Sequence, residues 1–492
     1  MLPNYLKREL SILFFVINKK QTTADEISQS LNFSKRIVKE NLLIINKHFT
    51  EYLSIENFIL SKKTGIITVR PELRTNAVSY AYHLKLFLLK NNVLFNYCVL
   101  LVTSDTIEKS QILEKLFISP SYLHKLTQRL NTFFDPFDFK IIRANHLYSL
   151  EGNEMNIRLF TYLFLQDSFQ DLEWPFPTIS IESLHNKVPK ELLEEAFKRP
   201  HTKNRTMDII SAVLQIRISK NHYVHPPKSI AIQTFFTLVQ DSFDITVPFQ
   251  KWYSSPIPET DKKVEIQYLN FLSHIFISDI VPKKEKIKLG KLFLGHDHSF
   301  CTLSRDILLS SIHIENFAVA KEHQYLCMYY LTFLNAFYFL VGNAIYPIIS
   351  LFIPSPTFHL HIQSKYLTAI TDKIAPIVDN VDHRTLIATA LYTLFTSKKS
   401  AQIKIYLQMI KDFTASYFIE NRLLSLYNPS SVIITDDYSL ADIIVTDTLE
   451  RGDPSKKVFY LDSVNNKESW QELIHLIQQS YLEQQGLQNE IN

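Results

Sequence analysis

The sequence predicts a multidomain, mainly α-helical protein that begins with two helix-turn-helix domains and ends with an α/β domain. Three observations predict this fold class. A helix-turn-helix pattern occurs twice within the first 150 residues, amphipathic helices fill the middle, and short apolar strands follow one another after residue 402. A chain of 492 residues is long enough for several domains, each with its own hydrophobic core.

The helix-turn-helix pattern is clearest in LFISPSYLHKLTQRL, which runs from Leu116 to Leu130. Its apolar residues follow a helical period broken by one tight turn, and Ser119 with Pro120 supplies an N-cap and a first-turn residue. A preceding helix is expected over Thr106 to Leu116. The second helix exposes groups that can contact base edges and phosphates, namely Ser121, Tyr122, His124, Lys125, Gln128 and Arg129.

The same arrangement occurs earlier in the chain. A helix over Thr22 to Leu31 is capped by Thr22 or Thr23, with Glu26 placed for a capping box. A second helix is predicted over Ser34 to Asn46, and two strands, Tyr52 to Leu60 and Gly65 to Arg70, then flank a basic hairpin tip. This hairpin is typical of the wing of a winged helix. The candidate DNA contacts of this unit are Ser34, Lys35, Arg36 and Lys39 in the helix, and Lys62 and Lys63 in the wing.

A single helix pair of this kind is equally consistent with an ordinary amphipathic packing unit, so the charge distribution matters. Residues 1–150 contain 20 Lys and Arg against 12 Asp and Glu, a net charge of +8, while the remainder carries 32 against 37. The basic charge lies where the two helix-turn-helix patterns lie, as nucleic-acid binding requires.

Composition excludes several other classes. The three cysteines form neither a zinc pattern nor a disulfide framework, which fits a reducing compartment, and no metal or other cofactor is expected. Seven glycines leave no Walker loop or GxGxxG motif. The N-terminus does not resemble a signal peptide, so we expect a cytoplasmic protein. The uncharged run from Tyr325 to Ile353 contains Asn335, Gly342 and Pro347, and we interpret it as helical core rather than a membrane span.

A resemblance to a known family is carried by EKLFISPSYLHKLTQRLN followed by YSLEGNEMNIRLFTYLF. These runs resemble the second helix-turn-helix of the Mga/AtxA family, DNA-binding virulence regulators of Gram-positive bacteria. The resemblance implies a non-enzymatic activator with two helical regulatory domains of the phosphotransferase-system type (PRDs) and a C-terminal domain similar to an enzyme IIB. The boundaries expected on this plan are 1–72 and 73–172 for the DNA-binding domains, 178–288 and 289–397 for the PRD-like domains, and 398–492 for the IIB-like domain.

The same resemblance implies three partners: double-stranded promoter DNA, a second copy of the chain bound through the C-terminal half, and the phosphocarrier protein of the phosphotransferase system. The phosphocarrier would phosphorylate histidines, because imidazole is nucleophilic near neutral pH. The candidates are His201, His323 and His383. His201 and His383 have basic neighbours that could hold a phosphoryl group.

Alternatives remain open from the sequence. A sugar-operon activator with PRDs would carry an enzyme IIB cysteine or an added enzyme IIA domain, and residues 398–492 contain no cysteine. A phosphoryl-relay protein of the phosphotransferase system would need the same cysteine. An RNA-binding antiterminator would open with a small β-sheet domain, whereas this chain opens with helices.

Overall fold

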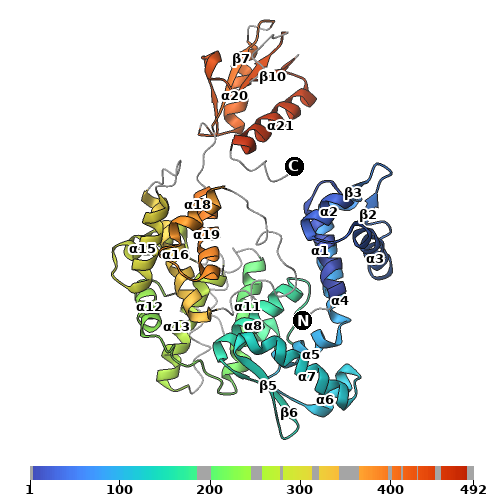
Figure 1. The fold of residues 1–492 in the computed structure, drawn as a ribbon, viewed down its shortest axis with the longest axis vertical. Coiled ribbons are helices and arrows are strands. Elements are labelled where there is room, and N and C mark those ends of the chain that lie inside the picture. The colour runs from blue at the N-terminus through green and yellow to red at the C-terminus, as the bar shows by residue number, and fades with distance from the viewer. Residues whose placement is uncertain are drawn as a thin grey trace. The chain divides into compact units, whose positions relative to one another are not determined.

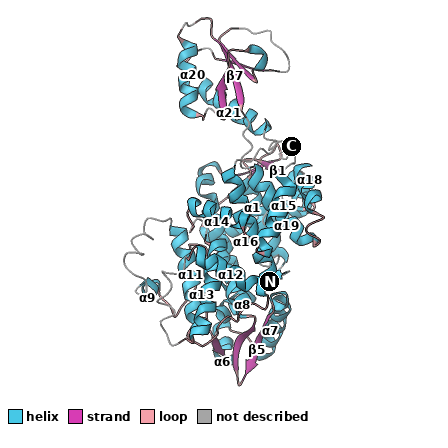
Figure 2. Cartoon of the chain, turned by 90° about the vertical axis from the view of Figure 1, so that its left-hand side faces the viewer, coloured by secondary structure: helices cyan, strands magenta, loops and turns pink. Residues whose placement is uncertain are grey.

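The computed structural model describes residues 4–185, 201–244, 257–277, 281–312, 321–342, 365–396, 402–411, 414–428, 430–448, 456–461 and 463–484. Helices account for most of this part of the chain, and the strands form small sheets (Figure 2). The chain divides into two compact units, Met1–Leu308 with Lys321–His361 and Leu309–Ala320 with Ile362–Asn492. Each unit is described by itself.

The first unit begins with a winged helix. Its elements are α1 (Asn4–Asn18), β1 (Thr22–Thr23), α2 (Ala24–Leu31), α3 (Lys35–Leu53), β2 (Ile59–Ser61) and β3 (Ile66–Val69), and the three strands form an antiparallel sheet in the order β1-β3-β2. The predicted end of α3 at Asn46 is wrong, because Phe49 continues the buried stripe and only the left-handed Ser54 (φ 55°) ends the helix. Tyr52 is therefore helical, and strand β2 is shorter than predicted.

The next part repeats this plan. After η1 (Pro71–Asn76), α4 (Ala77–Lys90) and α5 (Val93–Val102) come β4 (Thr106–Glu108), α6 (Lys109–Leu116), α7 (Pro120–Phe134), η2 (Asp135–Phe137), β5 (Phe139–Ala144), β6 (Leu147–Gly152) and α8 (Glu154–Phe169), drawn from light blue to teal in Figure 1. The predicted helix from Thr106 is wrong in its first turn, because Thr106, Ile107 and Glu108 pair with β6 in a sheet of order β4-β6-β5.

The rest of the first unit is helical. It contains α9 (Ile181–His185), α11 (His201–Ile218), α12 (Ile230–Ser242), α13 (Glu259–Phe276), α14 (Lys283–Gly295), α15 (Ser299–Ile312) and α16 (Lys321–Val341). The expected domain boundary between residues 288 and 289 falls inside α14. Within the PRD-like domain expected over 178–288, residues 186–200 lie outside the described residues. The segment between the expected domains at 73–172 and 178–288 is packed, since Phe176 is buried and Arg205 stacks 4.6 Å from the Trp174 ring.

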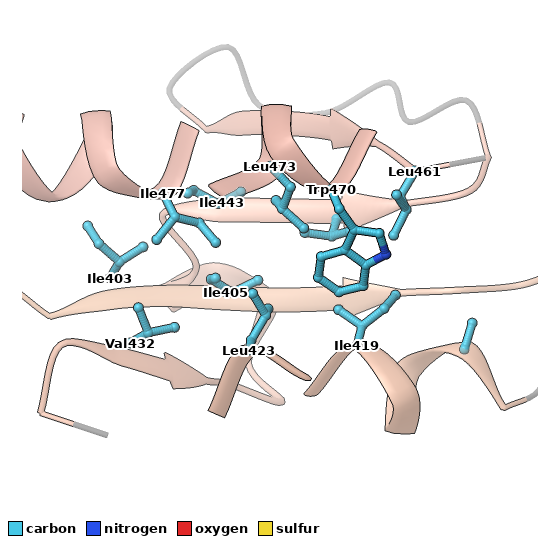
Figure 3. Close-up of a cluster of buried hydrophobic side chains, with 12 residues drawn as sticks. Ile403, Ile405, Ile419, Leu423, Val432, Ile443, Leu461, Trp470, Leu473 and Ile477 are labelled. Atoms are coloured by element: carbon cyan, nitrogen blue, oxygen red, sulfur yellow. The ribbon is translucent and has the colours of Figure 1, made fainter. Parts of the chain in front are cut away.

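The second unit contains α18 (Lys365–Ile374), α19 (Val381–Thr396), β7 (Ile403–Gln408), α20 (Ala415–Leu426), β8 (Val432–Ile434), η5 (Tyr438–Leu440), β9 (Ile443–Thr446), β10 (Lys457–Tyr460) and α21 (Lys467–Gln484). Its four strands are all parallel, in the order β10-β9-β7-β8. Side chains of α20 and α21 meet Ile403, Ile405 and Ile443 in one hydrophobic core (Figure 3).

Helices α20 and α21 cover the same face of this sheet. The parallel register places Ile403, Ile405 and Ile443 on one face, and α20 and α21 both pack there. On the opposite face Ile433, Val458 and Tyr460 are exposed. At the centre of that face Ile444 of β9 is fully buried, so the central strand is covered on both of its sides.

Membrane-spanning segments were sought among the described residues. No single helix there is both long and apolar enough to cross a bilayer, although the pair Pro71–Lys90 and Val93–Val102, bent by 89°, has the length and composition to do so. The helix α16, which holds most of the uncharged run, is largely buried.

Candidate nucleic-acid interface

The second winged unit presents α7 as its most exposed polar helix. Ser119 caps this helix by accepting a hydrogen bond from the Tyr122 amide, and Pro120 occupies the first turn, both as predicted. Leu123, Leu126 and Leu130 are buried against the rest of the unit. This packing turns the opposite side of the helix toward solvent, where the six predicted contact residues are all exposed: Ser121, Tyr122, His124, Lys125, Gln128 and Arg129.

The turn before α7 contains an unusual residue. Phe117 ends α6 in the left-handed conformation (φ 53°), and its side chain is 92% exposed. Left-handed backbone is unfavourable for a residue with a bulky side chain, and exposure of a phenylalanine gains no burial energy. The sequence analysis did not single out this residue, because helical periodicity alone does not reveal a left-handed turn.

The wing of this unit is fastened to α7 by one asparagine. Asn131 donates a hydrogen bond from Nδ2 to the Ile141 carbonyl oxygen (3.3 Å) and accepts one at Oδ1 from the Ile141 amide (2.7 Å). The hairpin tip beyond it exposes Arg143, Asn145 and His146. The sequence analysis missed these wing residues. The polar run between the buried positions of β5 and β6 could have indicated an exposed hairpin tip there.

The first winged unit is built in the same way. Ser34 caps α3 by accepting from the Ile37 amide. Asn46 forms the matching pair of hydrogen bonds to the backbone of Ile59, both at 2.8 Å. Six predicted contact residues are exposed on this unit: Ser34, Lys35, Arg36 and Lys39 on or just before α3, and Lys62 and Lys63 in the β2–β3 hairpin, which closes as predicted through the Lys62 and Gly65 backbone.

The two exposed helices differ in how their cations are paired. On α3, Lys35 pairs with Asp25, and Arg36 Nε lies 2.8 Å from Glu40 Oε1. The hydrogen bond to Glu40 and the charge of Glu40 raise the pKa of Arg36. On α7, neither Lys125 nor Arg129 forms an ion pair with a described residue. Their neighbours Gln128 and His124 form a hydrogen bond with each other at 3.1 Å. The α7 face therefore carries uncompensated positive charge.

The second winged unit is similar to a domain of known proteins. Residues 81–165 match the family model described as the Mga helix-turn-helix domain, which spans α4 to most of α8. Residues 81–165 are called the Mga domain here after this match. A protein of Streptococcus pneumoniae serotype 4 named "Putative trans-acting regulator" is 20% identical over 281 residues, covering 55% of this chain and 53% of the relative. The chain thus spans about half the length of this curated relative. The resemblance to the Mga family of regulators is confirmed.

The Mga domain is joined to the following helices by a buried ionic network on α8. Arg158 binds Glu265 of α13 through two nitrogens at 2.6 and 2.9 Å, and binds Glu154 one turn earlier at 2.8 Å. Arg217 of α11 binds the same Glu154 at 2.6 Å. Arg217 also lies 3.5 Å from Asp105, which pairs with His222 at 2.8 Å.

The network lowers the pKa of Glu154. Burial would by itself raise the pKa of Glu154, but the hydrogen bonds and charges of Arg217 and Arg158 outweigh burial and hold that pKa below its ordinary value. The glutamate therefore stays ionised. The sequence analysis missed this network, because Arg158 and Glu265 lie 107 residues apart and nothing in their local sequence predicts the contact.

The three predicted phosphorylation sites lie in different environments. His201 is the first residue of α11, and its side chain lies outside the described residues. His323 and His383 are buried, with 5% and 4% exposure, and burial lowers the pKa of His383 to about 4. Arg384, expected to help hold a phosphoryl group, instead donates hydrogen bonds to the Val378 and Asp379 carbonyls. In this conformation the two buried imidazoles are shielded from a phosphocarrier.

No group of three or more potential metal ligands is found among the described residues. His298, which the sequence places in a His-Asp-His run, hydrogen-bonds instead to the Ala231 carbonyl and the Thr234 hydroxyl.

Proposed function

We propose that this protein is a transcriptional regulator that binds double-stranded promoter DNA through its two winged helix-turn-helix units. The observation that carries the proposal is the exposed face of α7 within the Mga domain, where hydrogen-bonding side chains are interspersed with two cations that have no ion pair among the described residues. Such a face combines groups that read base edges with groups that neutralise phosphates. The wing beside it, fixed by Asn131, adds Arg143 at a position suited to backbone contact.

The finer parts of the proposal follow the family resemblance. The regulator acts as an activator, and phosphorylation of histidine by the phosphocarrier protein of the phosphotransferase system controls it. His201 is the leading site, because His323 and His383 are buried. Residues 398–492 serve as an enzyme IIB-like module without the phosphorylated cysteine, and they support homodimerisation. The exposed Ile433, Val458 and Tyr460 on the edge strands of their sheet are compatible with that role.

The test is a salt titration of DNA binding with the intact protein and the double variant Lys125→Ala, Arg129→Ala. Each phosphate contact contributes about 0.9 to the slope of log affinity against log salt, so the loss of two contacts should lower the slope by about 1.8. The matched control is Lys284→Ala, Lys291→Ala, which removes two exposed lysines of α14 and should leave the slope unchanged. An equal slope in the α7 variant and the parent would refute the assignment of α7 to DNA.

A further inference from the structure

The turn between α6 and α7 carries an apolar ring that lies outside the hydrophobic core. Phe117 is 92% exposed, more than any other large hydrophobic side chain in the part of the chain that the structure describes. Hydrophobic side chains stabilise a fold by leaving water, so an exposed ring contributes little of this free energy. Packing within the chain therefore does not explain why a phenylalanine stands at this position.

The backbone at this position also favours a different residue. Phe117 has a φ of 53°, and its amide donates a hydrogen bond to the Glu114 carbonyl at 3.3 Å, which fixes the turn. At the equivalent turn of the first winged unit Asn32 has a φ of 54°, and asparagine adopts left-handed backbone at less cost than phenylalanine. A residue that is kept at a cost to stability is a candidate for a functional role.

The place of this turn on DNA follows from the docking of helix-turn-helix proteins, so the inference rests on the proposed function. In such complexes the first helix crosses the sugar–phosphate backbone, and the N-terminal residues of the second helix contact base edges in the major groove. Helix α6 is the first of these helices and ends at Leu116, and α7 is the second and begins at Pro120. Phe117 therefore lies where the chain passes from the DNA backbone to the base edges, just before the exposed Ser121 and Tyr122 of α7.

The chemistry of the ring limits what it can contact on DNA. A phenylalanine side chain has no hydrogen-bond donor or acceptor, and the apolar group that base pairs present in the major groove is the C5-methyl group of thymine. Phosphates are suited to the cations Lys125 and Arg129 of α7 and not to an uncharged ring. We infer that Phe117 contacts the methyl group of a thymine in the major groove, and so gives the protein a preference for thymine at that base pair.

The experiment compares thymine with uracil, which differs from thymine only by the missing methyl group. Duplexes that the intact protein binds are selected from a random-sequence DNA library, and each thymine of a selected duplex is then replaced in turn by uracil. Fluorescence anisotropy measures the affinities. For the parent protein, replacement of at least one thymine should weaken binding roughly three- to fivefold, as the lost burial of one methyl group predicts.

The decisive variant is Phe117→Asn, which suits the left-handed turn and should stay folded by circular dichroism. It should bind the thymine duplex roughly three- to fivefold more weakly than the parent, and bind equally well with thymine or uracil at the sensitive position. Its slope of log affinity against log salt should be unchanged, because no phosphate contact is lost. The matched control is Tyr417→Asn, which removes a ring of α20 that is 74% exposed and should keep the parent's preference for thymine.

Three results would overturn the inference: a parent that binds equally tightly whichever thymine is replaced, a Phe117→Asn variant that keeps the parent's preference at every thymine, or a lower salt slope in that variant. In all three cases the protein still binds DNA, so the proposed function stands. A parent that retains no duplex from the library would instead refute the proposed function, and the inference with it.

Discussion

Ser34 and Ser119 begin equivalent helices, and the same backbone plan follows from each. Twelve residues after each serine stands an asparagine, Asn46 or Asn131, that holds the wing by two hydrogen bonds to one strand residue. Fifteen residues after each serine a buried phenylalanine closes the core. The two winged units are therefore one structural design used twice in the chain.

Their surfaces nevertheless differ at matching positions. Gln128 and Arg129 of α7 correspond to Leu43 and Ile44 of α3, which are 72% and 39% exposed. Lys35 and Arg36 of α3 also have acidic partners, whereas Lys125 and Arg129 have none among the described residues. The number of cations alone therefore does not predict which helix binds phosphate better. Helix α3 has more positive charges, but α7 has more that lack an acidic partner among the described residues and can bind a phosphate.

Attachment to the rest of the chain differs as well. The second winged unit is tied to α11 and α13 by the buried network on Arg158. The ion pairs Lys35–Asp25 and Arg36–Glu40 of the first winged unit lie at the surface. Buried pairs respond strongly to the loss of one partner, and surface pairs contribute little. The contact between the second winged unit and the helices α11 and α13 therefore contributes more to the free energy of unfolding than the surface ion pairs of the first winged unit.

The largest expected effect is at that junction. Arg158→Met leaves Glu154 and Glu265 without their main cation, and we expect the free energy of unfolding to fall by about 3–5 kcal/mol. Urea denaturation followed by circular dichroism measures this. Lys90→Met, which breaks the exposed pair with Glu173, is the control and should change stability little. Similar losses in both variants would contradict the buried role of Arg158.

The next effect tests whether the two units share one design. Asn46→Ala and Asn131→Ala each remove two hydrogen bonds to a strand and leave backbone groups unpaired, so each should cost about 2 kcal/mol of unfolding free energy. Matched denaturation curves of the two variants provide the comparison. If only one variant loses stability, the two asparagines hold equivalent positions but do not contribute equally to the free energy of unfolding.

A smaller effect is expected for the α3 cations in DNA binding. The double variant Arg36→Ala, Lys39→Ala removes two cations, of which only Lys39 lacks an acidic partner among the described residues. The slope of log affinity against log salt should therefore fall by about 0.9, half the change expected for the α7 double variant. Fluorescence anisotropy with a labelled promoter fragment at several salt concentrations measures it. A fall as large as that of the α7 variant would remove the distinction drawn between the helices.

The smallest effect concerns the turns. Phe117 and Asn32 occupy the same left-handed position, at φ 53° and 54°. Asparagine tolerates this conformation, so Phe117→Asn should raise the free energy of unfolding by about 1 kcal/mol and Asn32→Phe should lower it by a similar amount. Thermal denaturation of the two reciprocal variants is the measurement. A destabilised Phe117→Asn would mean that the phenylalanine ring contributes contacts that outweigh the backbone strain.

Much of the fold could be predicted from sequence because its signals are local. The caps Ser34 and Ser119, the helical spacing of Leu123, Leu126 and Leu130, and the turn at Gly65 depend on neighbours only a few residues away. The order of elements and the exposure of the predicted α7 face followed from these signals. Helix ends were less accurate, since the end of α3 depends on the conformation of Ser54 and the start of α6 depends on pairing with a distant strand.

The sequence by itself determined which helices can carry DNA contacts and where their polar faces lie, because amphipathic periodicity and capping are properties of short segments. Only the tertiary structure decided which cations lack an ion pair among the described residues, which histidines are buried, that α20 and α21 share one face of the C-terminal sheet, and that Arg158 meets Glu265. Each of these depends on side chains brought together from distant positions, and the energy of a charge or hydroxyl is set by what surrounds it in space rather than by its neighbours in sequence.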